Sequence, residues 1–306
     1  MPLHILESRY KGVMRWLELP IKTLGLLRRA RPQTLFVQNP SLALSSLATL
    51  CRPFFSYLLV IDAHNEGVRP YDRQSAFVRW LTSRLLKMAD VTIVTNEALA
   101  SDVRDAGGRP VVLPDALPVP PALEATICRQ GRPTDVVVVA TYRRDEPIAA
   151  LMAAARSMPD VSFAFSGDVA KFRKTTIDVP SNVRLTGFLP DSDYWQLLND
   201  ATVVCDLTLK SDCLVCGAYE ALALGKAMLL SDNPATRDIF APAAVFTGSN
   251  AEEIASALRS ALDTRKVLEA GAQELNKTYD LKWQDDARKG MESIMLRAAK
   301  KRGPVR

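Results

Sequence analysis

Two acidic residues, Asp212 and Glu220, stand eight positions apart where a loop is predicted to run into a helix, with Gly217 near the start of that helix. A helix N-terminus presents N–H groups without a partner in the helix, together with the positive end of the helix dipole. Glycine lets a phosphate approach the backbone closely. A carboxylate one turn into the helix can accept two hydrogen bonds from a ribose diol. The stretch therefore indicates a site for a phosphate and a sugar.

Two cysteines, Cys213 and Cys216, lie between these acids and raise the alternative of a metal site. A structural zinc site needs four ligands. The sequence has no second Cys-x-x-Cys pair, and its two histidines are not paired. We therefore predict that the cysteines are small apolar packing residues and that the protein holds no metal.

His64 follows directly on a predicted buried strand and is flanked by Asp62 and Asn65. An imidazole at the edge of a cleft can donate a hydrogen bond to a sugar hydroxyl or a phosphate, or can carry a proton. The alternative is a histidine that caps a helix or lies in a loop. The position at a strand end favours a functional role.

Arg143 and Arg144 follow the first predicted strand of the second half of the chain. A guanidinium presents paired donors that suit a pyrophosphate. Ion pairs with Asp145 or Glu146 are the alternative. The sequence favours phosphate binding and does not distinguish the two arginines.

The elements that must position these residues alternate between strand and helix. Apolar runs predict strands over 34–38, 57–62, 91–95, 109–114, 135–141, 161–167, 182–187, 202–208, 227–232 and 243–248. Amphipathic runs predict helices over 41–50, 75–88, 96–107, 147–158, 192–200, 217–225 and 250–263. This alternation is typical of an α/β fold with doubly wound parallel sheets.

A proline-rich stretch interrupts the alternation and divides the chain. We predict a Rossmann-like domain over 1–118, a connector over 119–134, a second Rossmann-like domain over 135–278, and a C-terminal helix with a basic tail over 279–306. The two domains are expected to face each other across a cleft. Ligands in such sheets bind at the carboxyl ends of the strands, where Gly167, Gly187 and Phe188 also lie.

The composition is that of a globular protein with reduced cysteines. The 306 residues are 48% hydrophobic and 24% charged, with a net charge of +5 and five cysteines in no framework spacing. Neither a dinucleotide fingerprint nor a Walker A, G-x-S-x-G or H-E-x-x-H motif occurs, which argues against dehydrogenases, phosphate-loop NTPases and the corresponding hydrolases. We expect a cytoplasmic protein.

Basic residues gather near the beginning of the chain, where residues 9–32 mix arginines and lysines with Met14, Trp16 and leucines. Such a segment can lie in the headgroup region of an anionic membrane. An ordinary helix of the first domain is the alternative. Pro20 is predicted to interrupt the segment. Nucleic acid is not an expected partner, because aromatic residues are not interleaved with the basic runs.

The stretch D-x7-E-A-L-A-L-G-K-A, from Asp212 through Glu220 to residue 227, resembles the E-x7-E motif of the retaining GT-B glycosyltransferases of family 4. The segments VRLTGFLPDSDYWQLLNDATVVCDL, DAHN, VTNEALASDV and YDLKWQDDARKGMESIM are similar to further parts of that family. The resemblance is spread over most of the chain.

The resemblance implies transfer of a sugar from a nucleoside diphosphate sugar to an acceptor hydroxyl, with retention and without a metal or other cofactor. Glu220 would hold the ribose, while Asp212 and His64 would orient the sugar. Arg143 or Arg144 and the N–H groups of Val215, Cys216 and Gly217 would stabilise the leaving diphosphate. The segment with Gly187 and Phe188 would hold the base. We expect a lipid-linked saccharide as the acceptor, at the inner face of the membrane, in polysaccharide or glycan synthesis.

Three departures from the family's pattern keep other functions open. Asp212 replaces a glutamate, the lysine expected after the arginine is missing at 145–147, and no glycine-rich loop opens the chain. A nucleotide-sugar epimerase and a catalytically weak or inactive binding subunit are therefore the alternatives.

Overall fold

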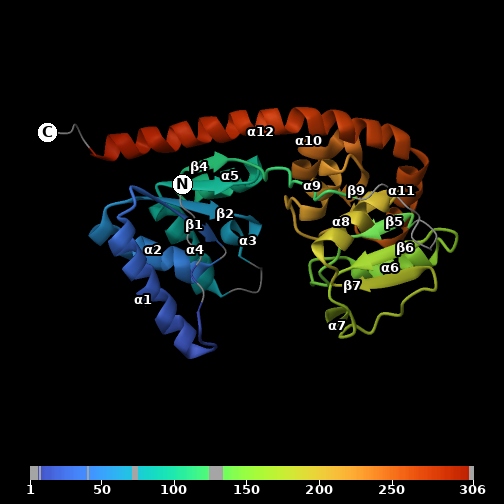
Figure 1. The fold of residues 1–306 in the computed structure, drawn as a ribbon, viewed down its shortest axis with the longest axis horizontal. Helices are drawn as coiled ribbons and strands as arrows, with labels where there is room; N and C mark the ends of the chain where they lie inside the picture. The colour runs from blue at the N-terminus through green and yellow to red at the C-terminus, as the bar shows by residue number, and fades with distance from the viewer. Residues whose placement is uncertain (1–5, 7, 40, 71–74, 124–133, 303–306) are drawn as a thin grey trace. The chain divides into compact units, whose positions relative to one another are not determined.

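The computed structural model of the protein describes residues 6, 8–39, 41–70, 75–123 and 134–302 (Figure 1). The chain divides into two compact units. Unit 1 comprises Met1–Pro114 and Asp286–Arg306, and unit 2 comprises Asp115–Asp285. Most of the predicted connector lies outside the described residues.

Unit 1 contains a parallel sheet with the strand order β1-β2-β3-β4. Its strands are β1 (Thr34–Asn39), β2 (Leu58–Ala63), β3 (Val91–Val94) and β4 (Pro110–Val112). Its helices are α1 (Val13–Ala30), α2 (Leu42–Phe55), α3 (Asn65–Val68), α4 (Ala76–Met88) and α5 (Glu97–Asp105). Ser41, Ser75 and Asn96 cap α2, α4 and α5 with their side chains, which explains where these helices begin.

The prediction that Pro20 interrupts the basic segment near the beginning of the chain is wrong. The helix α1 runs without a break from Val13 to Ala30 with Pro20 inside it. A proline removes one hydrogen bond from a helix, here the one that the carbonyl of Trp16 would accept. Because Trp16 is exposed, water can satisfy that carbonyl.

Unit 2 contains a parallel sheet with the strand order β10-β9-β8-β5-β6-β7. The strands are β5 (Val136–Val138), β6 (Phe163–Ser166), β7 (Val183–Gly187), β8 (Val203–Asp206), β9 (Ala227–Ser231) and β10 (Ala244–Thr247). The helices are α6 (Ile148–Arg156), α7 (Val169–Phe172), α8 (Asp191–Asp200), α9 (Cys216–Ala223), α10 (Pro234–Phe240) and α11 (Ala251–Asp263), with a 3-10 turn η1 (Ala241–Ala243).

Apolar side chains cover both faces of this second sheet. Val136 and Val138 belong to one cluster, together with buried residues of α6 and α11. Val137, between them, belongs to the opposite cluster, together with buried residues of α9 and α10. Strands buried on both faces are continuous apolar runs, which is why these strands are readable in the sequence. The fold is thus α/β with two Rossmann-like units.

The last helix, α12 (Arg265–Arg302), belongs to both units. It begins 14 residues before the helix predicted from residue 279. Within unit 2, Ala272 and Tyr279 of α12 pack in the same cluster as α9, and the hydroxyl of Tyr279 donates a 2.7 Å hydrogen bond to the carbonyl of Asp115. Within unit 1, Ile294 packs against Leu58 and Val60 of β2.

No helix among the described residues combines the length and the apolar character needed to cross a membrane.

Candidate functional site

The strand order of unit 2 places a topological switch point between β5 and β8. From β5 the chain adds β6 and β7 on one side, and then returns to place β8 on the other side. The connections that leave β5 and β8 therefore diverge to opposite sides of the sheet at their carboxyl ends, and ligands bind in the crevice that results. The two connections, residues 139–147 and 207–215, carry Arg143, Arg144 and Asp212 from the sequence prediction.

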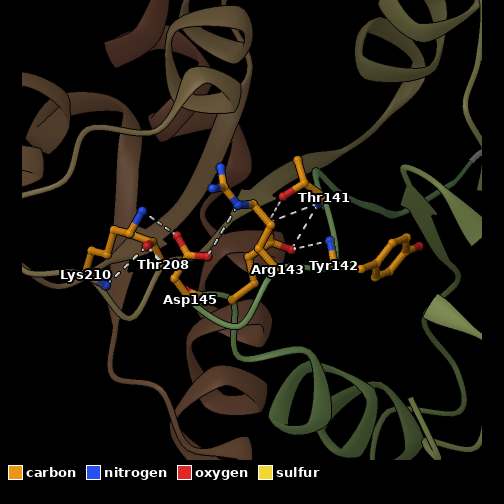
Figure 2. A network of polar contacts seen from close by, with 7 residues as sticks. Thr141, Tyr142, Arg143, Asp145, Thr208 and Lys210 are labelled. Carbon is orange, nitrogen blue, oxygen red and sulfur yellow. Dashed lines mark hydrogen bonds and ion pairs between the residues drawn. The ribbon is translucent and has the colours of Figure 1, made fainter. Parts of the chain in front are cut away.

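Hydrogen bonds join these two connections to each other (Figure 2). The carbonyl of Asp145 accepts a 2.6 Å hydrogen bond from the N–H of Leu209 and a 3.3 Å hydrogen bond from the hydroxyl of Thr208. The carboxylate of Asp145 lies 2.8 Å from Nζ of Lys210 and 4.0 Å from Nε of Arg143. Burial raises the pKa of Asp145, but the contact with Lys210 and the charge of Arg143 outweigh it, and the pKa lies below its ordinary value.

A second carboxylate, that of Glu146, closes the turn after β5. It accepts a 2.9 Å hydrogen bond from the N–H of Tyr142, hydrogen bonds of 3.0 and 3.1 Å from the N–H of Thr141, and one from the Thr141 hydroxyl. Tyr142 has a left-handed φ of 56°, which turns its N–H toward the same carboxylate. The two N–H groups that this turn presents are thus bound to an internal anion.

A third carboxylate, that of Asp206, ends β8 and is buried. It accepts a 2.9 Å hydrogen bond from the N–H of Gly217 at the start of α9. Burial raises the pKa of Asp206 to about 8; the Gly217 bond opposes this shift, while the charges of Glu146 and Glu220 add to it.

Gly217 is required here by packing. A Cβ at this position would lie 2.6 Å from Oδ2 of Asp206 and 2.9 Å from a methyl carbon of Val139. The sequence predicted that Gly217 faces a phosphate, whereas its N–H is bound to Asp206 in this structure. The N-cap residue of α9, Val215, makes no capping hydrogen bond with its side chain, and Cys216 is exposed in the first turn.

Glu220 lies in the second turn of α9 and is half-buried. The hydroxyl of Tyr194, on α8, donates a 2.6 Å hydrogen bond to Oε2 of Glu220. Burial raises the pKa of Glu220, and the Tyr194 hydrogen bond lowers it in part. Asp212 lies in the turn before α9, half-buried, with a left-handed φ of 51°.

The remaining predicted residues of unit 2 lie at strand ends. Gly167 follows β6 with a φ of 102°, and a Cβ there would lie 2.1 Å from the carbonyl oxygen of Ala140. Gly187 ends β7 with a φ of 77°, and Phe188 after it is 88% exposed. Arg144 is exposed, and its side chain forms no hydrogen bond or ion pair with any residue that the structure describes.

His64 lies in unit 1, at the end of β2 and at the N-cap position of α3. It is half-buried, and its side chain makes no capping hydrogen bond in the described part of the chain. A cavity of about 420 Å³ elsewhere in unit 1 is lined by residues of α3, α4 and α5, including Arg69 and Asp102, and not by His64.

Three polar residues of the site were given no role by the sequence prediction: Tyr194, Asp206 and Lys210. Glu146 was considered only as an ion-pair partner of the arginines. Asp206 carried a readable signal, because an acid inside the apolar run VVCDL must be satisfied or neutral once buried. Tyr194 and Lys210 come from a helix and a loop whose spacing gives no indication of their partners. Among the described residues, no group of three or more His, Cys, Asp or Glu side chains could hold a metal ion.

The sequence matches one family model, described as glycosyl transferase-like, over residues 143–288, just under half of the chain. The matched residues cover most of unit 2, including the connection after β8 and the part of the connection after β5 from residue 143 onward. No curated protein shows significant sequence similarity to the chain.

Solved structures match the fold over most of the chain. A sucrose-phosphate synthase from Thermosynechococcus elongatus has a TM-score of 0.78 at 15% identity, covering 95% of this chain and 81% of its own. Anabaena HepE in complex with UDP-glucose has a TM-score of 0.76 at 14% identity, covering 91% of this chain and 82% of its own. A putative UDP-N-acetylglucosamine 2-epimerase from Listeria monocytogenes has a lower TM-score of 0.59 at 17% identity, covering 89% and 76%. The two Rossmann-like units therefore match the GT-B fold.

Proposed function

We propose that this protein is a glycosyltransferase that moves a sugar from a nucleoside diphosphate sugar to an acceptor hydroxyl. The observation that carries the proposal is the switch point of unit 2. There a cation, Arg143, lies in the connection after β5, and a half-buried carboxylate, Glu220, lies on α9, the helix that follows the connection after β8. A ligand with both a diphosphate and a ribose needs these two kinds of group.

The difficult step is breaking the bond between the anomeric carbon and the diphosphate, since negative charge grows on the leaving phosphate. Arg143 stabilises that charge. Glu220 accepts hydrogen bonds from the ribose, and Tyr194 holds its carboxylate in position. Asp212 and His64 orient the sugar. The reaction proceeds with retention at the anomeric carbon and without a metal ion, as the family resemblance implies.

Uridine is the base that we propose for the donor. HepE, which shares the fold, was solved in complex with UDP-glucose and with UDP. Phe188, exposed after β7, offers a ring on which a base can stack. UDP and UDP-sugars are therefore the first ligands to test.

The decisive experiment incubates the protein with UDP-sugars, with and without lipid-linked saccharide acceptors, and follows transfer, hydrolysis and interconversion of the donor. We expect transfer by the unmodified protein and its loss in Glu220→Ala, with EDTA leaving the rate unchanged. Epimerised UDP-sugar without acceptor would establish the epimerase instead. UDP binding by both proteins without any turnover would establish a binding subunit.

We also propose that the acceptor is a lipid-linked saccharide and that α1 contacts the membrane on which it lies. One side of α1 packs on unit 1 through Leu27. A second apolar side of α1 consists of residues at helical spacing whose exposed fractions are 77, 58, 69 and 40%: Val13, Leu17, Ile21 and Leu24. Arg28 and Arg29 end this helix and suit anionic headgroups.

A further inference from the structure

Lys210 is a cation at the switch point that reaches from one connection to the other. It belongs to the connection after β8, and its Nζ lies 2.8 Å from the carboxylate of Asp145 in the connection after β5 (Figure 2). Its side chain is only 18% exposed, against 53% for that of Arg143. A partly buried ammonium is less screened by water than an exposed one, so its charge acts more strongly on an anion nearby.

The backbone that carries Lys210 is held in place on both sides. The N–H of Thr208 donates a 2.8 Å hydrogen bond to the hydroxyl of Ser231, which in turn donates a 2.9 Å hydrogen bond to the Thr208 carbonyl. The N–H of Lys210 donates to the Thr208 hydroxyl at 3.2 Å. Asp145 fixes the far end of the side chain. A charge fixed before the ligand arrives costs less conformational entropy on binding.

The charges around the switch point show why such a cation is needed. Residues 140–146 and 206–220 contain five carboxyl groups and three cations, Arg143, Arg144 and Lys210. Burial raises the pKa of Asp206 to about 8 and keeps it protonated at neutral pH, so four of the five carboxyl groups count as acids there. A diphosphate brings further negative charge to this surplus of acid. Binding it requires cations whose positive charge is directed at the ligand.

We propose that Lys210 is a phosphate-binding residue of the donor site, acting beside Arg143 and held by Asp145 as a positioning residue. The inference rests on the proposed function, because it assigns a residue to the diphosphate of that donor. The connection after β5 carries no lysine at residues 145–147. Lys210 supplies a positive charge from the connection after β8 instead.

The test compares the binding of UDP, UMP and uridine by the full chain, by titration calorimetry, in Lys210→Gln and Lys210→Met. Glutamine can still donate a hydrogen bond to Asp145, so the connection keeps its tie while the charge is lost. We expect UDP affinity to fall at least about tenfold, as for the loss of a hydrogen bond to a charged group, with uridine affinity unchanged. Lys277→Gln is the matched control, since Lys277 also pairs with a carboxylate in unit 2.

The outcomes separate this inference from the proposed function. If the affinity of Lys210→Gln for UDP lies within twofold of that of the unmodified protein, the role of Lys210 is overturned. The donor site then stays in place. Equal losses for UDP and uridine also overturn it, because they indicate a general loss of the site. An unmodified protein that binds none of UDP, ADP and GDP overturns the proposed function itself.

Discussion

The hydroxyl of Tyr194 donates a 2.6 Å hydrogen bond to the carboxylate of Glu220, and this contact joins α8 to α9 at the carboxyl edge of the second sheet. Burial and the charge of Glu220 raise the pKa of Tyr194 well above its ordinary value, so the phenol stays protonated and keeps the proton that it donates to Glu220. The bond leaves Glu220 with further lone pairs that can accept from a ligand.

Tyr194→Phe is expected to weaken UDP binding by about threefold to tenfold, the effect of one ordinary hydrogen bond. Because the Tyr194 bond lowers the pKa of Glu220, its loss moves that pKa further up. As the pH is lowered, Glu220 becomes protonated and the affinity for UDP falls. In Tyr194→Phe this fall should begin at a higher pH than in the unmodified protein. Calorimetric titrations from pH 5 to 8 measure this. A uniform loss at every pH would show that Tyr194 does not act through the ionisation of Glu220.

Much of the fold could be predicted because its information is local. Each of the ten β-strands of the described residues lies within, or within a residue of, a predicted apolar run, and serine and asparagine caps mark several helix starts. The first half of α12 was missed although buried residues recur along it at helical spacing, namely Leu268, Ala272 and Tyr279. The site was harder to predict: Glu220 follows from its spacing to Asp212, but the Tyr194, Asp206 and Lys210 contacts join residues 11 to 65 positions apart.

Asp206→Asn is expected to change how stability depends on pH. The pKa of Asp206 is raised from 3.8 to about 8, so between these values the folded protein holds a proton that the unfolded chain has released. The free energy of unfolding therefore falls as the pH rises through this window. Asparagine has no such proton and can still accept from the Gly217 N–H.

The free energy of unfolding should thus decline less in Asp206→Asn than in the unmodified protein between pH 5 and 8. We expect the two curves to diverge by more than about 1 kcal/mol, since each pKa unit corresponds to about 1.4 kcal/mol. Urea unfolding at several pH values gives both curves, and other titrating groups cancel in the comparison. Parallel curves would mean that Asp206 is ionised in the folded protein.

Gly217→Ala is expected to destabilise the protein by about 1–3 kcal/mol, as overpacking commonly does. The added Cβ would lie 2.6 Å from Oδ2 of Asp206, so either the carboxylate or α9 must move. Gly25→Ala, inside α1, is the control: a Cβ there meets nothing within 4 Å, and alanine favours a helix. An equal effect of the two substitutions on the urea midpoint would contradict the packing role of Gly217.

Arg143→Ala is expected to weaken UDP binding by about tenfold or more, and Arg144→Ala by less than about twofold. The sequence could not distinguish these arginines. Arg143 lies 4.0 Å from Asp145 in the network of the switch point, whereas the Arg144 side chain contacts none of the described residues through a hydrogen bond or an ion pair. The better-ordered guanidinium loses less entropy when the diphosphate binds. The reverse order of losses in calorimetry would assign the phosphate to Arg144.

A membrane role for α1 predicts that Leu17→Glu and Ile21→Glu each reduce binding to vesicles containing anionic phosphatidylglycerol. Both side chains are exposed on the second apolar side of α1, so the substitutions should leave stability unchanged while opposing insertion beside anionic headgroups. Val267→Glu, at a site 71% exposed on α12, makes the same charge change elsewhere and should bind normally. Flotation of the unmodified protein should also weaken with salt, because Arg28 and Arg29 contribute. Equal flotation of all three variants would refute the membrane role of α1. If the protein forms a concentration-dependent dimer that only the α1 variants lose, that side of the helix binds a second copy of the chain instead.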